Sequence, residues 1–367
     1  MNRLNVLVAG STGYIGVQLV KLLCKHRYIK IKYLCGNSSI GKKIHFYDKE
    51  LKKYNLPKII KINYKYFKEV DVIFTALPNG QSQIIANNLD KKNVLIDLSA
   101  DFRIKKVNIY EKFYKIKHKS KKLLNESVYG LSELNKKLIR NKKIIACPGC
   151  YPTSIIIPLF PLFKKRYLKK KNLIIDSKSG YSGAGRSILK KNKEMNLFKT
   201  LSAYGISNHR HNAEIDQELS FLSKKIRFNF TPHILPMFRG ILSTIYVEKE
   251  KTISTEKVVK FLKEFYKKHK FIRINKKNAL IGTKNVINTN YCDISVCETK
   301  NKNRLVILSA VDNLIKGGAG QAVQNLNIKF GFKIDEGLIW CEFYYLLFSQ
   351  FYYRVVIIIL TVNLLRL

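Results

Sequence analysis

The sequence predicts an α/β protein in which a doubly wound parallel sheet is followed by a second domain with a more antiparallel, α+β sheet. Short apolar strands rich in β-branched residues alternate with helical stretches through the first part of the chain. A glycine-rich turn joins the first strand to the first helix. Beyond Cys150 the apolar runs are separated by longer, less regular segments. With 367 residues, the chain is long enough for two domains of ordinary size.

The first domain is expected to span residues 1–149. Its strands are predicted from short apolar runs that end in turn residues. These strands cover residues 5–9, 29–34, 70–76, 94–98 and 144–146. Apolar side chains from Val17 to Leu23 recur at helical spacing and predict the helix that follows the first strand. This alternation is typical of a Rossmann-type parallel sheet.

The second domain is expected to span residues 150–311. Its predicted strands cover residues 173–176, 226–230, 242–247 and 305–309. A helix over residues 254–268 interrupts them. A last helix is expected over residues 312–330, where Ala319, Ala322, Val323 and Leu326 share one helical face.

The formal net charge of +43, from 68 Lys and Arg against 25 Asp and Glu, is the most unusual bulk property. One explanation is a nucleic acid or an acidic membrane as partner. The other is a composition biased throughout toward Lys, Ile, Asn, Tyr and Phe. We favour the second, and expect no nucleic-acid partner, because the basic residues form short scattered runs such as 164–166 and 169–171.

The seven cysteines are odd in number and lack the spacing of a disulfide framework. The chain begins directly with a predicted strand instead of a secretory signal. Both features favour a reduced protein in the cytoplasm.

Residues 339–367 differ from the rest because they are mostly apolar and aromatic. Glu342, Arg354 and Arg366 are their only charged side chains. The longest stretch without strongly polar residues, 355–362, is shorter than the ~20 residues of a membrane-spanning helix. A poor membrane anchor, a docking segment and a non-functional extension all remain open. Since every motif below precedes residue 339, a chain that ends at Leu338 is expected to stay active.

A glycine motif lies between the first strand and the first helix, where dinucleotide-binding proteins hold a pyrophosphate. Glycine lets the backbone approach the phosphates, and a helix N-terminus favours their charge. The predicted cofactor-binding residues of this turn are Gly10, Ser11, Thr12, Gly13, Tyr14, Ile15 and Gly16.

The segment after the second strand indicates which cofactor binds. An NAD site usually has an acidic residue there that holds the ribose 2′-hydroxyl. Residues 35–43 contain no acid but include Ser38, Ser39 and Lys42, which suit a 2′-phosphate. The sequence therefore favours NADP, with an ordinary polar loop as the alternative.

The sharpest local signal is the segment Cys147-Pro148-Gly149-Cys150-Tyr151-Pro152-Thr153. Cys150 follows a buried strand and opens a predicted helix, whose N-terminus should lower the pKa of the thiol. A redox pair and half of a metal site are the alternatives. We favour a nucleophile, because the preceding domain is unlike a thioredoxin fold and the other close pair, Cys292 and Cys297, is remote; no metal site is predicted.

A nucleophilic cysteine needs an acid or base nearby in space. The best supplier in the sequence is His209-Arg210-His211, with Glu214 three residues further on. Glu214 is expected to orient one of the two imidazoles and to determine its tautomer.

Two further segments are candidates for substrate binding. The loop from Ser179 to Arg186 offers backbone amides and hydroxyls, with Gly180 and Ser182 within it, although a tight structural turn is an equal alternative. Arg103 follows the fourth strand, where open α/β sheets place ligands, and its guanidinium suits a phosphate or carboxylate.

Taken together, these motifs resemble the N-acetyl-γ-glutamyl-phosphate reductase family, a branch of the aspartate-semialdehyde dehydrogenase superfamily. The resemblance covers residues 1–338. It is carried by residues 10–16, 97–103, 148–153, 179–186, 204–205, 209–211, 231–233, 236–240 and 312–322.

This resemblance implies a cysteine–thioester mechanism. Cys150 would attack an acyl phosphate, phosphate would leave with help from Arg103, and NADPH would reduce the thioester to an aldehyde. A histidine, His209 in preference to His211, would act as acid and base. The resemblance adds Gly183, Asn313 and Gly317 to the cofactor site and Tyr204 to the substrate site. It also implies that helix 312–330 completes the first domain and that the second domain forms a dimer or tetramer.

Three residues depart from the pattern of this family. Cys147 stands where Asn is usual, so a disulfide with Cys150 is conceivable. Ala213 replaces a usual proline, and Pro158 lies inside the predicted helix, where a kink or an early end is expected.

Two alternatives to the acetylglutamyl substrate remain, aspartyl phosphate and carrier-bound aminoadipyl phosphate. An alternative of a different class is a basic nucleic-acid- or membrane-binding protein whose catalytic site has decayed.

Overall fold

The computed structural model describes residues 3–186 and 199–339. Its first sheet has seven strands in the order β3-β2-β1-β4-β5-β7-β6, and every neighbouring pair is parallel. The strands are β1 Leu4–Ala9, β2 Ile29–Cys35, β3 Ile59–Ile60, β4 Val72–Thr75, β5 Val94–Asp97, β6 Ser127–Tyr129 and β7 Ile144–Ala146. The predicted doubly wound parallel sheet is confirmed.

The core of this domain lies on both faces of the sheet, because alternate residues of each strand point to opposite sides. Val6 and Val8 of β1 pack with the helices on one face, and Leu7 packs on the other. The helices around the sheet are α1 Tyr14–Leu23, α2 Gln81–Asn87, α3 Val107–Tyr114 and α4 Ser132–Asn141. Short 3-10 turns cover Ile44–Phe46, Lys49–Lys53, Tyr64–Glu69 and Lys121–Leu124.

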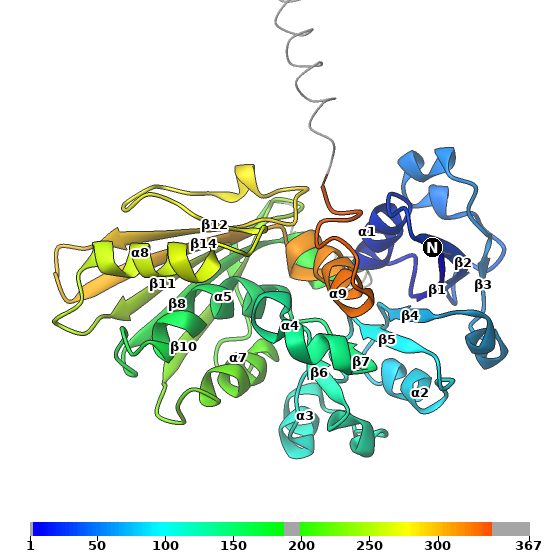
Figure 1. Ribbon diagram of the computed structural model, residues 1–367, viewed down its shortest axis with the longest axis horizontal. Helices are drawn as coiled ribbons and strands as arrows, with labels where there is room; N and C mark the ends of the chain where they lie inside the picture. The colour runs from blue at the N-terminus through cyan, green and yellow to red at the C-terminus, as the bar shows by residue number, and fades with distance from the viewer. Residues whose placement is uncertain (1–2, 187–198, 340–367) are drawn as a thin grey trace, which may run out of the picture.

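The second sheet also has seven strands, in the order β12-β13-β14-β11-β8-β10-β9, and it mixes parallel and antiparallel pairs. The strands are β8 Leu173–Gly180, β9 Ser202–Ala203, β10 Phe228–Leu235, β11 Ile241–Glu248, β12 Ile272–Ile274, β13 Cys292–Glu298 and β14 Arg304–Val311. Helices α5 Cys150–Lys164 and α8 Thr255–Tyr266 pack on one face (Figure 1). The remaining elements are α7 His211–Ser220 and short turns over Tyr181–Ala184 and Thr283–Asn285.

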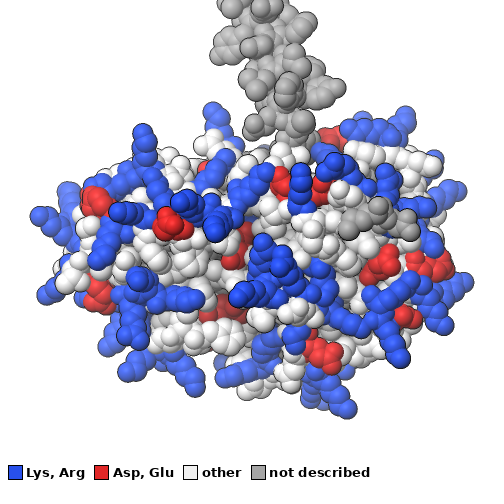
Figure 2. All heavy atoms as spheres, viewed as in Figure 1, with Lys and Arg blue, Asp and Glu red and all other residues white. Residues whose placement is uncertain are grey.

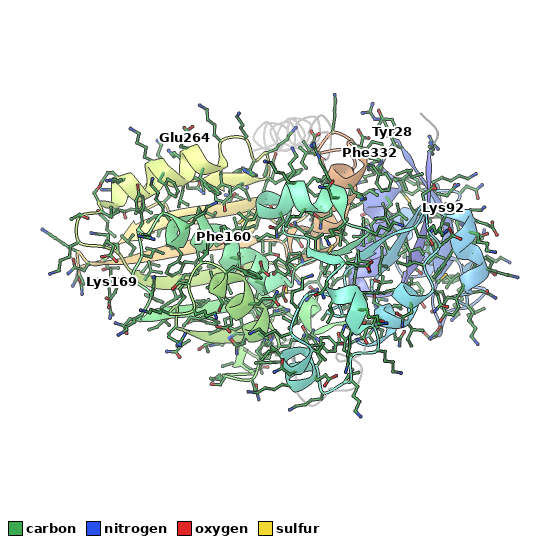
Figure 3. The ribbon with its side chains drawn as sticks, turned by 60° about the horizontal axis from the view of Figure 1, so that its bottom comes forward. Tyr28, Lys92, Phe160, Lys169, Glu264 and Phe332 are labelled. Carbon is green, nitrogen blue, oxygen red and sulfur yellow. The ribbon has the colours of Figure 1, made fainter. Side chains whose placement is uncertain are left out.

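The chain returns to the first domain through α9, Gly320–Phe330, which lies between the two sheets in Figure 1. Its buried face packs with α1 and with strands of the first sheet. Just beyond it, Phe332 stacks on Tyr28 with ring centroids 4.9 Å apart, and Figure 3 shows the two side by side. The expected single helix over 312–330 is interrupted, because residues Ile315–Ala319 form a π-helical turn before α9 begins.

Helix α5 continues through Pro158 and Pro161 to Lys164, so an early end at Pro158 is wrong. A proline inside a helix leaves the carbonyl four residues earlier without its usual donor. For Pro161 that carbonyl belongs to Ile157, and Tyr266 of α8 donates a hydrogen bond to it at 2.5 Å. A tertiary contact therefore replaces a missing helical hydrogen bond.

Lysine and arginine side chains are spread over the whole visible face of both domains, with acidic side chains between them (Figure 2). Within the described ranges, no helix is both long and apolar enough to cross a membrane. The role of the apolar segment 339–367 was left open among an anchor, a docking segment and a non-functional extension, and its residues 340–367 lie outside those ranges.

Candidate active site

A cavity of about 810 Å³ lies where the carboxyl ends of the parallel strands face the second domain. Residues that follow β1, β2, β4, β5 and β7 line it, together with the turn after β8 and the segment before α9. Among its described lining residues there is no acid and no lysine, and the charged ones are Arg103, Arg186 and Arg210. Such a cavity suits ligands with several negative charges.

The glycine turn forms one end of this cavity. Gly10 has a φ of +82°, and a Cβ there would lie 2.3 Å from the carbonyl oxygen of Ala76, so only glycine lets the turn pass so close to the end of β4. Helix α1 then starts at Tyr14 with its N-terminus at the cavity. These features fit the pyrophosphate of a dinucleotide. Thr12, Gly13, Ile15 and Gly16 also line the cavity.

Ser11 does not line the cavity, although it was predicted to bind the cofactor. Its hydroxyl donates to the carbonyl of Cys35 at 3.1 Å, and its backbone amide does so as well. Ser11 therefore ties the glycine turn to the end of β2.

Of the three residues predicted to hold a 2′-phosphate, Ser38 lines the cavity and the other two do not. The hydroxyl of Ser39 is buried against that of Tyr47. Lys42 is exposed, because hydrogen bonds between its segment and Ile59 hold the chain along β3 and away from the cavity. The placement of Ser39 and Lys42 is corrected accordingly.

Arg186 reaches from the second domain to the end of the cavity that the glycine turn forms, which is called the nucleotide end below. Its guanidinium carbon lies 4.6 Å from the ring centroid of Tyr14 and 5.2 Å from that of Tyr47. Its Nε is buried and has no hydrogen-bond partner among the described residues. The sequence assigned Arg186 to the substrate, whereas the structure places it beside the glycine turn.

Cys150 is the first residue of α5 and lines the cavity at the carboxyl end of β7. Burial raises the pKa of its thiol, while the Tyr151 amide and the charges of Arg103 and Arg210 act in the opposite direction. The expected lowering of this pKa is therefore wrong, because desolvation outweighs the helix N-terminus. Gly317 packs directly on Cys150, since a Cβ at position 317 would lie 2.6 Å from that of Cys150.

His211 is the imidazole that packs against the start of α5. It is buried, lines the cavity, and lies so close to Gly149 that a Cβ there would be 2.4 Å from His211 Nε2. His209 is not among the lining residues. Its ring packs against Tyr151 and Tyr204, and its Nδ1 accepts a hydrogen bond from the His211 amide at 3.1 Å. This placement favours His211 over His209, which was preferred from the sequence.

Both imidazoles are neutral near pH 7. Burial lowers the pKa of His209 to about 4, with a smaller contribution from Arg210. Burial also lowers the pKa of His211 well below its ordinary value, and His209, Arg210 and Arg103 add to the effect. A neutral imidazole is able to accept the proton of the Cys150 thiol.

Glu214 does not contact an imidazole but accepts a hydrogen bond from the backbone just before Cys150. Its Oε1 accepts hydrogen bonds from the Gly149 amide at 2.6 Å and from the Tyr129 hydroxyl at 2.7 Å. The structure shows no hydrogen bond from Glu214 to His209 or His211 within the residues it describes, so the predicted orienting role is corrected. Glu214 lies on α7 one turn after His211, where it reaches the start of α5.

Arg103 lines the cavity, but protein acceptors occupy its three nitrogens. Nε donates to the Cys147 carbonyl at 2.7 Å, Nη2 donates to the Leu98 carbonyl at 3.1 Å, and Nη1 lies 3.5 Å from Glu214. The side chain is only 7% exposed. These contacts join the end of β5 to the start of α5 and use three of the five N–H donors, so two donors are left for the predicted phosphate contact.

The turn after β8 closes the other side of the cavity. Ser182 and Gly183 line it, whereas Ser179 and Gly180 belong to β8 and Tyr204 lies behind Tyr151, to whose hydroxyl it donates at 3.3 Å. Ser179, Gly180 and Tyr204 do not line the cavity, and their substrate contacts stay predictions.

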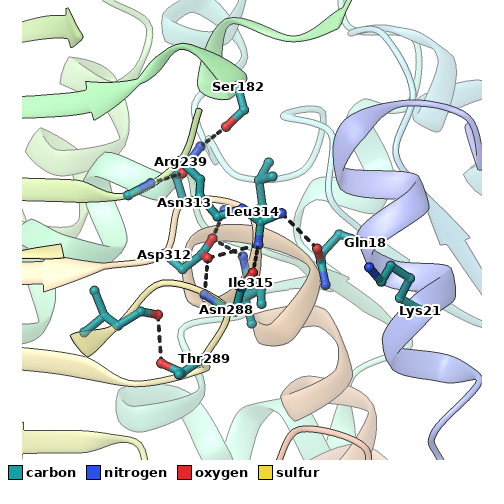
Figure 4. Close-up of polar contacts among 12 residues, drawn as sticks. Gln18, Lys21, Ser182, Arg239, Asn288, Thr289, Asp312, Asn313, Leu314 and Ile315 are labelled. Atoms are coloured by element: carbon teal, nitrogen blue, oxygen red, sulfur yellow. Dashed lines mark hydrogen bonds and ion pairs between the residues drawn. The ribbon is translucent and has the colours of Figure 1, made fainter. Parts of the chain in front are cut away.

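Asn313 joins this turn to the start of the α9 segment (Figure 4). Its Nδ2 donates to Ser182 Oγ at 2.9 Å and its Oδ1 accepts from the Gly240 amide at 2.8 Å. Next to it, Arg239 donates to Asp312 at 3.2 Å and to Gln18 of α1 at 3.2 Å. Arg239 thus bridges the two domains beside Asn313, which lines the cavity. In the sequence, the only signal for this role of Arg239 was its place in residues 236–240, one of the segments that carry the family resemblance.

The described residues contain no group of three or more His, Cys, Asp or Glu arranged for a metal ion. Cys147 and Cys150 are both free. The buried Cys147 thiol accepts a hydrogen bond from Asn325 of α9 at 3.6 Å. Cys292 and Cys297 both lie on β13.

Comparison with known proteins identifies the class of this site. Residues 5–142 match the NAD binding domain of semialdehyde dehydrogenases, and residues 150–313 match their dimerisation domain. Aspartate semialdehyde dehydrogenase II from Vibrio cholerae has the same fold, with a TM-score of 0.67 at 17% identity, covering 90% of this chain and 99% of that one. The Candida albicans enzyme, solved with NADP, has a TM-score of 0.61 at 17% identity, covering 89% and 98%. Fold and domains define a two-domain semialdehyde dehydrogenase.

Relatives of higher identity narrow the class. The N-acetyl-gamma-glutamyl-phosphate reductase of Desulforamulus reducens is 43% identical over 351 residues, which are 93% of this chain and 99% of the relative. A probable chloroplastic reductase of the same name from Arabidopsis thaliana is 39% identical, covering 90% and 82%. The chain belongs to the N-acetyl-gamma-glutamyl-phosphate reductase family.

Proposed function

We propose that the protein reduces N-acetyl-γ-glutamyl phosphate to N-acetylglutamate semialdehyde with NADPH, as a step of arginine biosynthesis. The observation that carries the proposal is Cys150 at the start of α5, next to the neutral His211, in an arginine-lined cavity that continues to a dinucleotide turn. The names of the relatives supply the substrate.

The chain's own residues support a base-assisted attack. Because the pKa of Cys150 is raised and that of His211 is lowered, the resting pair is a neutral thiol and a neutral imidazole. His211 takes the thiol proton as sulfur bonds to the acyl carbon, and the carbon–oxygen bond to phosphate breaks. A thioester on Cys150 and free phosphate result.

A bound nicotinamide would supply the hydride that reduces the thioester carbon. The carbon–sulfur bond then breaks, the aldehyde leaves, and the Cys150 thiolate recovers its proton from His211. Glu214 and Arg103 act through position, because together they hold Gly149 and Cys147, both of which lie just before the helix that starts at Cys150.

NADP is the favoured cofactor. The described cavity lining contains no acid to hold a 2′-hydroxyl, and Arg186 lies at the nucleotide end with an unpaired Nε. A guanidinium at this place suits a 2′-phosphate.

The protein is proposed to form a dimer or tetramer through the open face of the second sheet. Ile174 and Tyr246 are cross-strand neighbours on that face and are 44% and 42% exposed. No nucleic-acid partner is proposed, since the basic side chains of the visible face are dispersed (Figure 2). The six cysteines of the described ranges are free, which suits the cytoplasm.

A reverse assay tests the reaction. N-acetylglutamate semialdehyde, NADP and phosphate are given to the wild type and to Cys150→Ser, NADPH is followed by absorbance, and aspartate semialdehyde serves as competing substrate. Phosphate-dependent NADPH formation that the variant lacks is the expected result. Preference for aspartate semialdehyde would change the substrate, and no turnover by folded protein would refute the reductase function.

A further inference from the structure

A second, smaller cavity lies at the end of the second sheet that is remote from Cys150. Its volume of about 350 Å³ is within the range of small-molecule sites. Strand β11 begins directly after Gly240, whose amide binds Asn313 of the first cavity, and it ends next to Lys249 of the second cavity. Because β11 has 8 residues, the two cavities lie roughly 25 Å apart. The second cavity is therefore separate from the candidate active site.

Positive charge is in excess in the second cavity. Its basic lining residues are Lys249, Lys300, Lys302 and Arg304, and its acidic ones are Glu256 and Glu298. Both acids form ion pairs with Lys277, which does not line the cavity. Arg304 lies 3.6 Å from Glu248, which is also outside the cavity. The three lysines are left to attract an anionic ligand.

Lys249 is the buried cation of this cavity. Its side chain belongs to a residue that is only 8% exposed, whereas Lys300 and Lys302 are exposed. The Lys249 ammonium has no hydrogen bond or ion pair with any other residue in the described part of the chain. A charge that is taken out of water is unfavourable unless it has a partner. An anion in the cavity would be that partner.

The N-terminus of α8 meets the same cavity. This 12-residue helix is capped by Ser254, whose hydroxyl accepts a hydrogen bond from the Lys257 amide at 3.2 Å. Thr255, the first residue of the helix, lines the cavity and is 3% exposed, and its hydroxyl has no hydrogen bond with another described residue. The first amides of a helix favour a negatively charged ligand. Lys249 and the start of α8 therefore offer a charge and several donors to one ligand.

We propose that this second cavity binds a phosphoryl anion, either inorganic phosphate or the phosphate ester of a small metabolite. The ligand binds to the Lys249 ammonium, the Thr255 hydroxyl and the N-terminus of α8. A phosphoryl group carries about −1.5 to −2 charge at pH 7 and has three strong acceptor oxygens, so it matches this combination of donors. The site does not depend on the reaction proposed for Cys150.

Isothermal titration with glycerol 3-phosphate and with inorganic phosphate tests the site in the wild type, Lys249→Met and Lys251→Met. Lys251 is the matched control, because it is exposed, close in the chain and outside the cavity. Lys249→Met should weaken binding at this site about 10- to 100-fold, since a charged hydrogen bond is lost. Lys251→Met should bind as the wild type does. An anion that binds beside Cys150 gives the same signal in all three proteins, so the difference between them measures the second cavity.

Urea denaturation without added anions shows whether Lys249 has only a structural role. Because its charge is buried without a partner, Lys249→Met should be at least as stable as the wild type. Thr255→Val keeps Lys249 and removes one donor, so it should weaken binding by up to about tenfold, and this variant decides if Lys249→Met fails to fold.

The two anions distinguish the two sources of the phosphoryl group. Binding of glycerol 3-phosphate that depends on Lys249 supports a phosphate ester as ligand, and binding of inorganic phosphate alone with the same dependence supports free phosphate. Wild-type protein that binds neither anion overturns the proposal. Equal affinities of the wild type, Lys249→Met and Thr255→Val for both anions also overturn it. Every readout is equilibrium binding, so a failure of the proposed reductase function would leave these results unchanged.

Discussion

The carboxylate of Glu214 accepts a hydrogen bond from the backbone amide of Gly149 at 2.6 Å, and this contact fastens α7 to the start of the helix that carries Cys150. Tyr129 donates to the same oxygen, and Arg103 lies 3.5 Å from the other one. Helix α7 therefore carries both His211 and Glu214, the residue that holds the backbone just before Cys150.

Glu214→Gln should reduce kcat about 10- to 100-fold, because the neutral amide weakens a charged hydrogen bond and leaves Arg103 without its counter-charge. Tyr129→Phe removes one donor and keeps the Gly149 contact, so its loss should be smaller. Steady-state kinetics and urea denaturation measure both effects. Equal kcat for Glu214→Gln and the wild type would contradict this positioning role.

Acid should destabilise the protein partly through His209. Its pKa is about 4 in the folded state, against about 6.5 when unfolded. Since the unfolded chain binds the proton more tightly, stability is full above pH 6.5 and falls as pH drops from there to about 4. This group contributes on the order of 3 kcal/mol over that range. His209→Gln should unfold with a shallower pH dependence below pH 6.5, as followed by urea titrations, and identical slopes would refute the prediction.

A buried ion pair supports the turn that meets Cys150. Lys316 is fully buried and donates to Glu133 at 2.6 Å and to Gln324 at 2.8 Å. Burial alone would raise the pKa of Glu133, but the charge of Lys316 and hydrogen bonds outweigh it, so this pKa is lowered. Lys316→Met should cost about 3–5 kcal/mol of unfolding free energy, because it strands a buried carboxylate.

The double variant Lys316→Met, Glu133→Gln should recover much of that loss, and urea denaturation compares the two proteins. The reductase activity of the two variants is a second measurement, because Lys316 directly precedes Gly317 and Gly317 packs on Cys150. A double variant as unstable as the single one would show that the charge is not the cause.

Arg186→Gln should weaken NADP binding about 10- to 100-fold and leave NAD binding within about twofold, since only NADP has the 2′-phosphate. Fluorescence titration of Cys150→Ser protein measures both dissociation constants without turnover. Lys42→Gln is the control that should behave as the wild type, because Lys42 lies outside the cavity. Equal losses for NADP and NAD would assign Arg186 to the pyrophosphate.

The sequence by itself determined the parallel sheet, the glycine turn and the placement of Cys150 at a helix start. Each of these depends on neighbours within a few residues, such as Gly10 before α1 or Gly149 before α5. Local conformation and hydrophobic periodicity are written into short segments, so short segments suffice to predict them.

Only the tertiary structure decided which side chains contact one another at the site. His209 and His211 are two residues apart, but α7 begins at His211 and turns that imidazole toward Gly149 while His209 packs on Tyr151. Arg103 was predicted as the phosphate ligand, and residues 44 and 111 positions away bind two of its five N–H donors. The thiol pKa likewise follows burial by the whole fold, which outweighs the local helix N-terminus. Contacts between distant segments determine which donors stay unpaired, and a sequence pattern contains no record of those contacts.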